Sequence, residues 1–251
     1  NLTAATVAIG EFSLTFVLPL FLVNSLGLST VRTGIVLAAM ALGAFFSGAS
    51  ARHLATRVGA TGVVVLGLTL EVIGVGLLAW VVGMQGSTWL IVLTLIVYGI
   101  GLGLASAQLT STVLHDIPTD QSGAGSATQS TVRQLGSALG AAIAGTALGS
   151  TMNHTIPDAV ASISAVPTRL LDKLVHITED SAGSAIPGLR NASPNSPFIR
   201  PLGKSRGAVI SSLETGFAHA AAWSIGLSSL FLVIGLLGAI MVRHEARKQV
   251  G

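Results

Sequence analysis

Two acidic side chains lie within long apolar segments of this sequence. Glu11 and Glu71 are flanked on both sides mainly by apolar and small residues. A charged side chain at the centre of a bilayer costs about 2.5–3.5 kcal/mol, so such residues are rare and are usually functional. Apolar surroundings favour the protonated form of a carboxyl group, and hydration favours its ionised form. The pattern predicts that Glu11 and Glu71 are proton-coupling groups.

The residues beside Glu11 have the chemistry of a ligand pocket. Phe12, Thr15 and Phe16 offer aromatic rings and a hydroxyl group, which suit a mostly apolar site with a few polar contacts. We predict these three and Tyr98 as substrate-cavity residues, although a phenol near the middle of a helix is more often a satisfied core group than a ligand contact. The alternative for both glutamates is a protonated group that bonds a neighbouring helix and strengthens the packing.

The remaining reactive residues do not form an enzyme site. No second acid lies at catalytic spacing from either glutamate, the six histidines are scattered, and the sequence contains no phosphate-binding loop or pair of metal ligands. The chain has no cysteine, which excludes disulfides and thiolate metal sites. We therefore predict that the protein is not an enzyme and that it uses no cofactor and no metal.

The elements that position these residues are predicted to be membrane-spanning helices. Hydrophobic residues make up 51% of the chain and charged residues 9%, against about 25% charged residues in soluble domains. Apolar runs of about 20 residues, each long enough to cross a bilayer, recur along the chain. The predicted fold class is an all-α integral membrane bundle of six helices. Their predicted ranges are 2–23, 33–51, 62–82, 89–109, 122–148 and 219–242.

The basic residues predict the orientation of the bundle. Lys and Arg are enriched in short cytoplasmic connections, and Trp is enriched at the interfaces. One side is assigned Arg52, Arg57, Arg133, Arg243, Arg247 and Lys248. The short loops of the other side contain only Arg32, and Trp80, Trp89 and Trp223 fall at this second interface. Both chain ends are therefore expected in the cytoplasm, in a multi-pass protein of the cell membrane in contact with lipids. The net charge of +3 reflects these connections, so no nucleic-acid partner is expected.

The segment 149–217 differs from the rest of the chain, because it contains six of the eight prolines and no apolar run long enough to span. We predict a long external loop between helices 5 and 6. Within it, residues 159–177 show the spacing of an amphipathic helix, whereas 186–201 is expected to be irregular. The predicted organisation is five helices over 1–148, an extracytoplasmic and partly helical loop over 149–217, and the last helix with a cytoplasmic tail over 218–251.

Glycine is concentrated in two of the predicted helices. Residues 99–103 read GIGLG and residues 136–140 read GSALG. Small residues let helices approach closely, and Gly-rich helices also bend or slide during alternating access. Gly136 and Gly140 are accordingly predicted as gating or packing positions, with plain packing as the simpler interpretation.

The order of motifs through helices 4 and 5 points to a family. A Gly-rich helix over 99–107 is followed by a turn with an acid and a proline, Asp116-Ile117-Pro118, then by SGAGSA at 122–127 and TVRQLGSALG at 131–140. This order resembles the fourteen-span drug:proton antiporters of the major facilitator superfamily. The segment 26–34 before helix 2 and the long loop before the last helix agree with it.

The resemblance implies that these helices correspond to spans nine to fourteen, which form the C-terminal half of a major facilitator fold. The N-terminal half would then be a partner that lies outside this sequence. In such a half the first, second, fourth and fifth helices approach the central cavity, which ranks Glu11 above Glu71. The family's cytoplasmic signature survives only in part over 52–60, where Arg57 and Gly59 remain but Thr56 replaces an acid. Arg57, Gly59 and Arg133 are counted among the gating or packing residues, with a positive-inside anchor as the alternative for Arg57.

Together these features predict proton-coupled export of lipophilic or cationic amphipathic compounds by alternating access, as in multidrug efflux. The expected partners are protons and a small amphipathic substrate. Two alternatives stay open. The same scaffold could export lipids, siderophores or amino acids, because a fold does not fix a substrate. The chain could also be a non-transporting membrane scaffold that binds a partner through its external loop.

Overall fold

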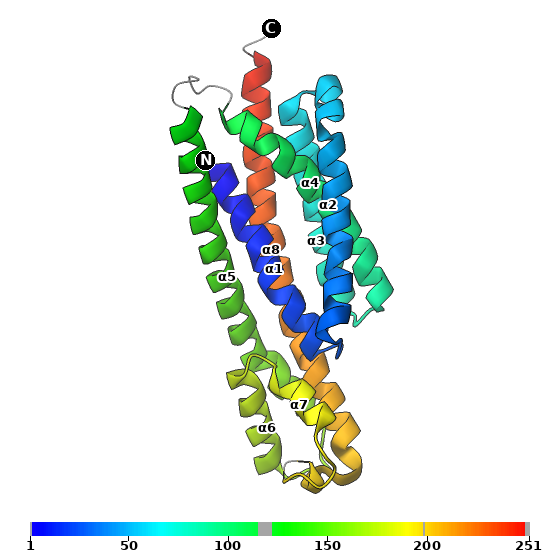
Figure 1. Cartoon of the computed structure of the whole chain (residues 1–251). Coiled ribbons are helices and arrows are strands. Elements are labelled where there is room, and N and C mark those ends of the chain that lie inside the picture. Colours follow the sequence, from blue (N-terminus) through cyan, green and yellow to red (C-terminus); the bar gives the residue numbers. More distant parts are fainter. Residues whose placement is uncertain (1, 115–121, 198, 249–251) are drawn as a thin grey trace.

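The computed structural model describes residues 2–114, 122–197 and 199–248, and these residues form helices joined by turns and short irregular segments, with no strand (Figure 1). The Asp116-Ile117-Pro118 turn lies outside the described residues. The elements in chain order are α1 Leu2–Asn24, α2 Thr30–Val58, α3 Ala60–Gly83, α4 Thr88–Leu114, α5 Ser122–Val160, α6 Thr168–Asp180, α7 Ala185–Asn191, the 3₁₀ helix η2 Arg200–Ser205 and α8 Arg206–Lys248.

Six of these helices are long and apolar enough to cross a membrane, which confirms the predicted fold class. They are α1 to α5 and α8 together with the preceding η2. α2 is longer than its apolar run, because Ser29 caps its first turn by accepting a hydrogen bond from the Arg32 backbone N–H at 3.4 Å. It ends at Gly59, whose φ of +80° is a conformation that favours glycine.

The six helices pack as two connected groups. α4 packs against both α2 and α3, and α1 packs against both α5 and α8. α3 also packs against α8 and so joins the groups. Glycines set the closest approaches: Gly99 faces the backbone of Met40, and a Cβ at Gly74 would lie 2.7 Å from the backbone nitrogen of Tyr98. The interior is therefore built on backbone contacts that leave no room for larger side chains.

α5 and α8 continue well beyond the spans predicted for them. With 39 and 43 residues, they are about 58 and 64 Å long at 1.5 Å per residue, against about 30 Å of hydrocarbon. The predicted boundaries at 149 and 217 thus fall inside helices. The two extensions pack on each other, since a Cβ at Gly216 would lie 2.8 Å from the carbonyl oxygen of Thr155. Together with α6, α7 and η2 they form the distal lobe, residues 149–217, at the end of the molecule opposite the chain termini (Figure 1).

Two helices of the distal lobe lie where the sequence predicts a loop. α6 is amphipathic, with Leu171, Leu174 and Val175 buried, although it spans 168–180 rather than 159–177. α7 covers 185–191, so the prediction that 186–201 is irregular is wrong for its first six residues. The cause is tertiary, because Ile186 and Leu189 are buried in the lobe.

Arg190 attaches this short helix to the bundle. Its Nε and Nη2 atoms donate to Glu214 Oε1 of α8 at 2.9 and 2.6 Å. Nη2 also donates to the carbonyl oxygens of Asn24 and Ser25, at 3.0 and 3.1 Å, where α1 ends. Gly27, with a φ of +65°, leaves the space that the guanidinium group occupies. Arg190 therefore ties the ends of α1 and α8 together.

Candidate functional site

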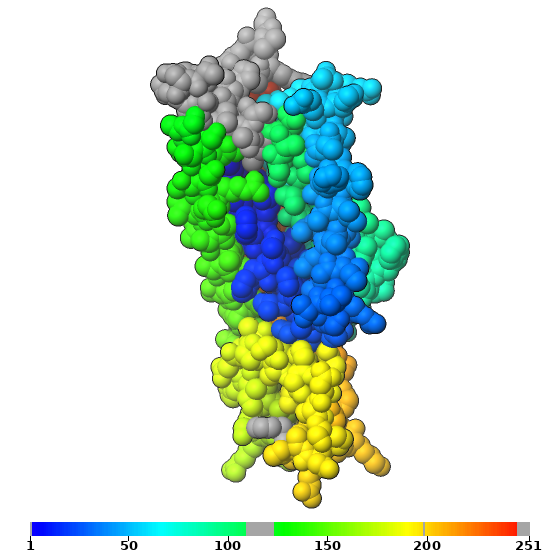
Figure 2. All heavy atoms as spheres, viewed as in Figure 1, coloured from blue at the N-terminus to red at the C-terminus, as the bar shows by residue number. Residues whose placement is uncertain are grey.

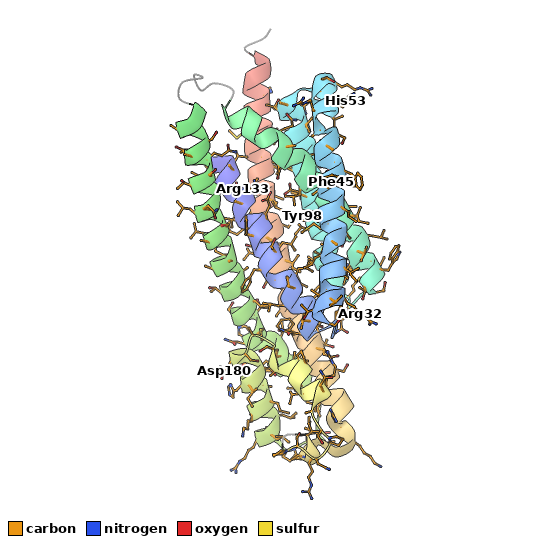
Figure 3. All side chains as sticks on the ribbon, in the orientation of Figure 1. Arg32, Phe45, His53, Tyr98, Arg133 and Asp180 are labelled. Atoms are coloured by element: carbon orange, nitrogen blue, oxygen red, sulfur yellow. The ribbon has the colours of Figure 1, made fainter. Side chains whose placement is uncertain are left out.

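An ion pair joins α1 to α5 inside the bundle. Arg133 Nη2 donates to Glu11 Oε2 at 2.9 Å. The Glu11 side chain is 7% exposed and that of Arg133 is 41% exposed. Figure 3 shows Arg133 on α5 beside the first half of α1. A buried carboxylate is therefore neutralised by a cation that also reaches open space.

The small residues of α5 bring the two helices close enough for this pair. A Cβ at Gly136 would lie 2.9 Å from the Ala5 carbonyl oxygen, and one at Gly140 would lie 3.0 Å from Ile9 Cα. The Gly140 carbonyl oxygen accepts a hydrogen bond from Ser13 Oγ at 2.8 Å. The predicted packing positions Gly136 and Gly140 thus lie in the same α1–α5 interface as the ion pair.

Glu71 lies in α3 with 0% of its surface exposed. Neither carboxyl oxygen has a hydrogen-bond partner among the described residues. Its Cγ lies against Gly101 of α4, where a Cβ would be 3.0 Å away. A carboxylate here would be a charge in an apolar surrounding without hydrogen bonds, which is strongly unfavourable. The protonated form fits this site.

Tyr98 is a buried neighbour of the glutamates. Tyr98 of α4 packs against Gly74 of α3 and is 1% exposed. Tyr98, Glu11 and Glu71 are close enough to interact electrostatically. In Figure 3 Tyr98 lies in the middle of the bundle. The structure thus brings Tyr98 near the acids but not onto an open surface.

The other predicted cavity residues lie on an uncovered face of α1. Phe12 and Phe16 are 38% and 41% exposed. Thr15 is also exposed, and its hydroxyl donates to the Glu11 backbone carbonyl oxygen at 2.8 Å. On the side drawn in Figure 2, α1 is visible between α5 and α2. Phe12, Thr15 and Phe16 therefore form an aromatic surface next to Glu11, from which Tyr98 is separate.

Arg57 and Gly59 lie away from this cluster. Both are exposed and end α2 near the chain termini. Arg57 makes no ion pair within the described part of the chain. Gly59 serves as the turn into α3.

The sequence places Arg133 among the cytoplasmic basic residues and among the gating or packing residues, but it does not predict the partner of this side chain. Arg133 is the twelfth residue of α5 and forms an ion pair with Glu11 within the bundle. Its place in the third to fourth turn of an apolar helix was a visible signal, because an intramembrane arginine normally has a partner. Within the arginine-glutamine-leucine-glycine run, Arg133 thus forms the ion pair and Gly136 packs against α1.

Comparison with known proteins decides the family. The profile described as Major Facilitator Superfamily matches residues 2–141, more than half of the chain. The chain belongs to this superfamily. Because the family consists of transporters, this assignment supports a transport protein and not an enzyme. Within the described residues there is also no group of three or more His, Cys, Asp or Glu side chains that could hold a metal ion.

Two curated relatives illustrate the similarity. The riboflavin transporter RibZ of Clostridioides difficile is 27% identical over 135 residues, which cover 53% of this chain and 29% of RibZ. The multidrug resistance protein B homolog of Mycobacterium tuberculosis is 27% identical over 156 residues, which cover 62% of this chain and 29% of that protein. The matched segments are therefore less than a third of each relative.

Proposed function

We propose that this chain is the C-terminal half of a proton-coupled exporter of lipophilic or cationic amphipathic compounds. The observation that carries the proposal is the Glu11–Arg133 pair, a buried carboxylate and a half-exposed cation 2.9 Å apart on two helices. A carboxyl group with one movable cationic partner can exchange that partner for a proton. The family and the named relatives support transport of small organic molecules.

The pair suggests how protons and substrate could compete. When Glu11 is ionised, it neutralises Arg133 and leaves no net charge beside the uncovered face of α1. A proton that binds Glu11 weakens the charge-assisted hydrogen bond. Arg133 then keeps an unpaired positive charge next to Phe12 and Phe16, which disfavours a bound cation. Proton uptake would thereby expel a cationic substrate, as an antiport cycle requires.

Glu71 is proposed as a supporting proton site. It is fully buried without hydrogen bonds in the described part of the chain, and it interacts electrostatically with Glu11. A charge on one of two nearby acids disfavours a charge on the other. A proton held on Glu71 would thus make it easier for Glu11 to remain ionised and paired with Arg133.

The proposed orientation places the chain termini in the cytoplasm and the distal lobe outside. Arg52 and Arg57 near the end of α2, and Arg243 near the end of α8, lie at the same end of the molecule as the termini, which fits the enrichment of basic residues on the cytoplasmic side. The proposed location is the cell membrane. Membership of a transporter family favours this account over a scaffold.

The test is transport by the full-length protein in liposomes with a pH gradient and tetraphenylphosphonium as the probe. Glu11→Gln is expected to abolish gradient-driven movement while the melting temperature in detergent stays within a few degrees. Glu71→Gln is expected to slow it without abolishing it. Asp158→Asn, which removes an exposed acid from the distal lobe, is the matched control and should behave like the wild type. Undiminished transport by Glu11→Gln would remove this residue from the mechanism.

A further inference from the structure

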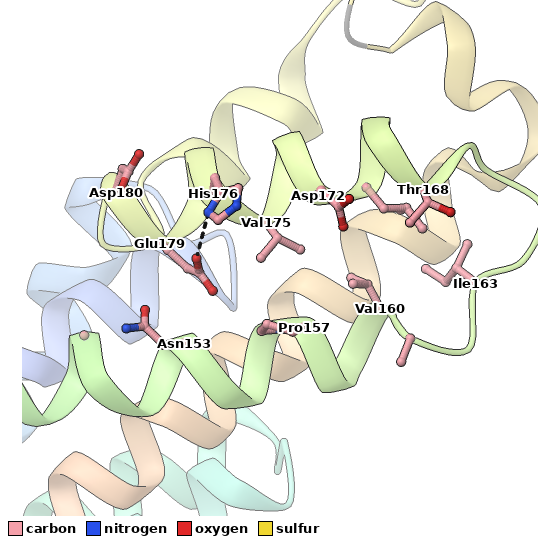
Figure 4. A pocket seen from close by; sticks show the side chains of 13 residues that line it. Asn153, Pro157, Val160, Ile163, Thr168, Asp172, Val175, His176, Glu179 and Asp180 are labelled. Carbon is pink, nitrogen blue, oxygen red and sulfur yellow. Dashed lines mark ion pairs between the residues drawn. The ribbon is translucent and has the colours of Figure 1, made fainter.

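The distal lobe contains a groove of about 830 Å³ between the end of α5 and α6 (Figure 4). Asn153, Pro157 and Val160 line it from α5, and residues of α6 from Thr168 to Asp180 line it from the other side. The volume is that of sites for small organic molecules, which are about 300–1,000 Å³. We call it the α5–α6 groove.

The two parts of the groove differ in chemistry. Its base is apolar, with Val160, Leu171 and Val175 buried. Three acidic side chains also line it: Asp172 and Asp180 are exposed, whereas Glu179 is only 14% exposed, and its Oε2 lies 3.5 Å from His176 Nδ1. No lysine or arginine lines the groove among the described residues. An apolar body with a positive charge is the chemistry that complements this lining.

The groove lies farther along α5 from the α1–α5 interface that contains the Glu11–Arg133 pair. Phe16 of α1 lies against Gly145 of α5, where a Cβ would be 3.6 Å from its ring. Gly149, Asn153 and Pro157 follow at intervals of four residues, which places neighbouring positions on one side of the helix. Gly149 and the two residues after it in this series line the groove. The aromatic face of α1 and the groove are thus connected along α5.

We infer that the α5–α6 groove is a second binding site for organic cations with an apolar body, placed after the Glu11 site along the export path. The inference rests on the proposed function for its direction of transport. Its binding chemistry stands on the lining alone. Within the groove, the apolar base holds the body of the ligand, and Asp172, Glu179 and Asp180 hold its charge.

The test is equilibrium binding of tetraphenylphosphonium to the detergent-solubilised full-length protein that carries Glu11→Gln. This variant should keep binding through the groove. Adding Asp172→Asn, Glu179→Gln and Asp180→Asn together is expected to weaken binding at least fivefold, whereas adding Asp158→Asn, an acid outside the groove lining, changes it less than twofold. Binding of the uncharged dye Nile red should change less than twofold in both cases. A second variant, Asn153→Trp, fills the groove from an exposed position and is expected to weaken binding of both probes.

Three outcomes would overturn the inference: no tetraphenylphosphonium binding to Glu11→Gln, equal loss with the triple variant and with Asp158→Asn, or destabilisation by Asn153→Trp with unchanged binding. These outcomes do not depend on the proposed function, which fails separately if Glu11→Gln leaves gradient-driven transport intact.

Discussion

Among single residues, four ionisable side chains from four helices lie within the bundle: Glu11, Glu71, Tyr98 and Arg133. Glu11 has a cation as its partner, Glu71 has no partner within the described residues, and Tyr98 lies within electrostatic reach of both. The contrast between the two acids gives them different roles. Glu11 can exchange Arg133 for a proton, whereas Glu71 can only hold a proton or lose it to its surroundings.

The ion pair leads to a prediction for stability. Arg133→Ala leaves the Glu11 carboxylate buried and unpaired, and because Arg133 is partly exposed we expect a loss of about 1–3 kcal/mol. The loss should grow with rising pH, since a protonated Glu11 does not need its partner and an ionised one does. Denaturation of the full-length protein in detergent at several pH values measures this.

A double variant and an exposed arginine provide the controls for this prediction. Glu11→Gln combined with Arg133→Ala should lose less stability than the sum of the two single changes, because the pair is lost only once. Arg57→Ala, at an exposed position, should change stability by no more than about 0.5 kcal/mol. A loss for Arg133→Ala that is the same at every pH would contradict a Glu11 that changes between a protonated form and an ionised form paired with Arg133.

The sequence shows part of this site and hides the rest for a physical reason. Glu11 and Glu71 stand out because a single acid in an apolar run is unusual whatever it contacts. The Glu11–Arg133 pair does not stand out, since it joins residues 122 positions apart and depends on how α5 is rotated against α1. The separation of Tyr98 from Phe12 and Phe16 likewise depends on helix rotation, which the sequence pattern of an almost uniformly apolar helix does not fix.

At the scale of elements, close packing of helices holds the site in place. α4 approaches α2 through Gly99 and Gly103, and it approaches α3 through Gly101. On α3, Gly67 and Gly74 lie against the α4 backbone, at Ala105 and Tyr98 respectively. These contacts are to backbone atoms, which cannot move aside as a flexible side chain can.

Two glycines of α3 allow a matched test of this packing. Gly74→Ala would place a Cβ 2.7 Å from the Tyr98 backbone nitrogen, and we expect a loss of about 1–3 kcal/mol from overpacking. Gly76→Ala, two residues later in the same helix, meets nothing within 4 Å and should be neutral or gain up to about 1 kcal/mol from helix propensity. Thermal unfolding in detergent distinguishes them, and equal effects would show that α3 and α4 are not packed in this register.

Hydropathy does not predict where several of the helices end. The apolar runs of α5 and α8 end near 148 and begin near 219, but both helices continue through more polar residues because their extensions pack on each other at Ile156 and Gly216. α7 forms for a similar reason, since Arg190 and two buried apolar residues attach it to the bundle. The six spans follow from local composition, whereas the distal lobe follows from contacts between distant segments.

At the scale of the whole molecule, the bundle has two unlike ends. One carries both chain termini and the connection from α2 to α3, and the other carries the distal lobe (Figure 1). The face of α1 with Phe12 and Phe16 remains uncovered between them. This arrangement fits the proposal that the chain is one half of a transporter.

The two ends give a prediction for orientation. This chain has no cysteine, so single cysteines can be introduced after any in the rest of the full-length protein are replaced. Arg57→Cys should react with a membrane-impermeant maleimide only after cells are permeabilised, because basic connections face the cytoplasm. Lys204→Cys, an exposed position in the distal lobe, should react in intact cells. The reverse pattern would place the lobe in the cytoplasm and exclude it from an exit path.

If Glu11 exchanges a proton for a cationic substrate, binding of the substrate must release protons, and this release can be measured. Tetraphenylphosphonium is added to the full-length protein in weakly buffered detergent solution at a pH where the empty site holds its proton, and released protons are counted with a pH indicator. The wild type is expected to release protons on binding. Glu11→Gln should bind the probe through the groove without releasing any, while Asp158→Asn should match the wild type. Equal proton release from Glu11→Gln and the wild type would show that Glu11 does not carry the exchanged proton.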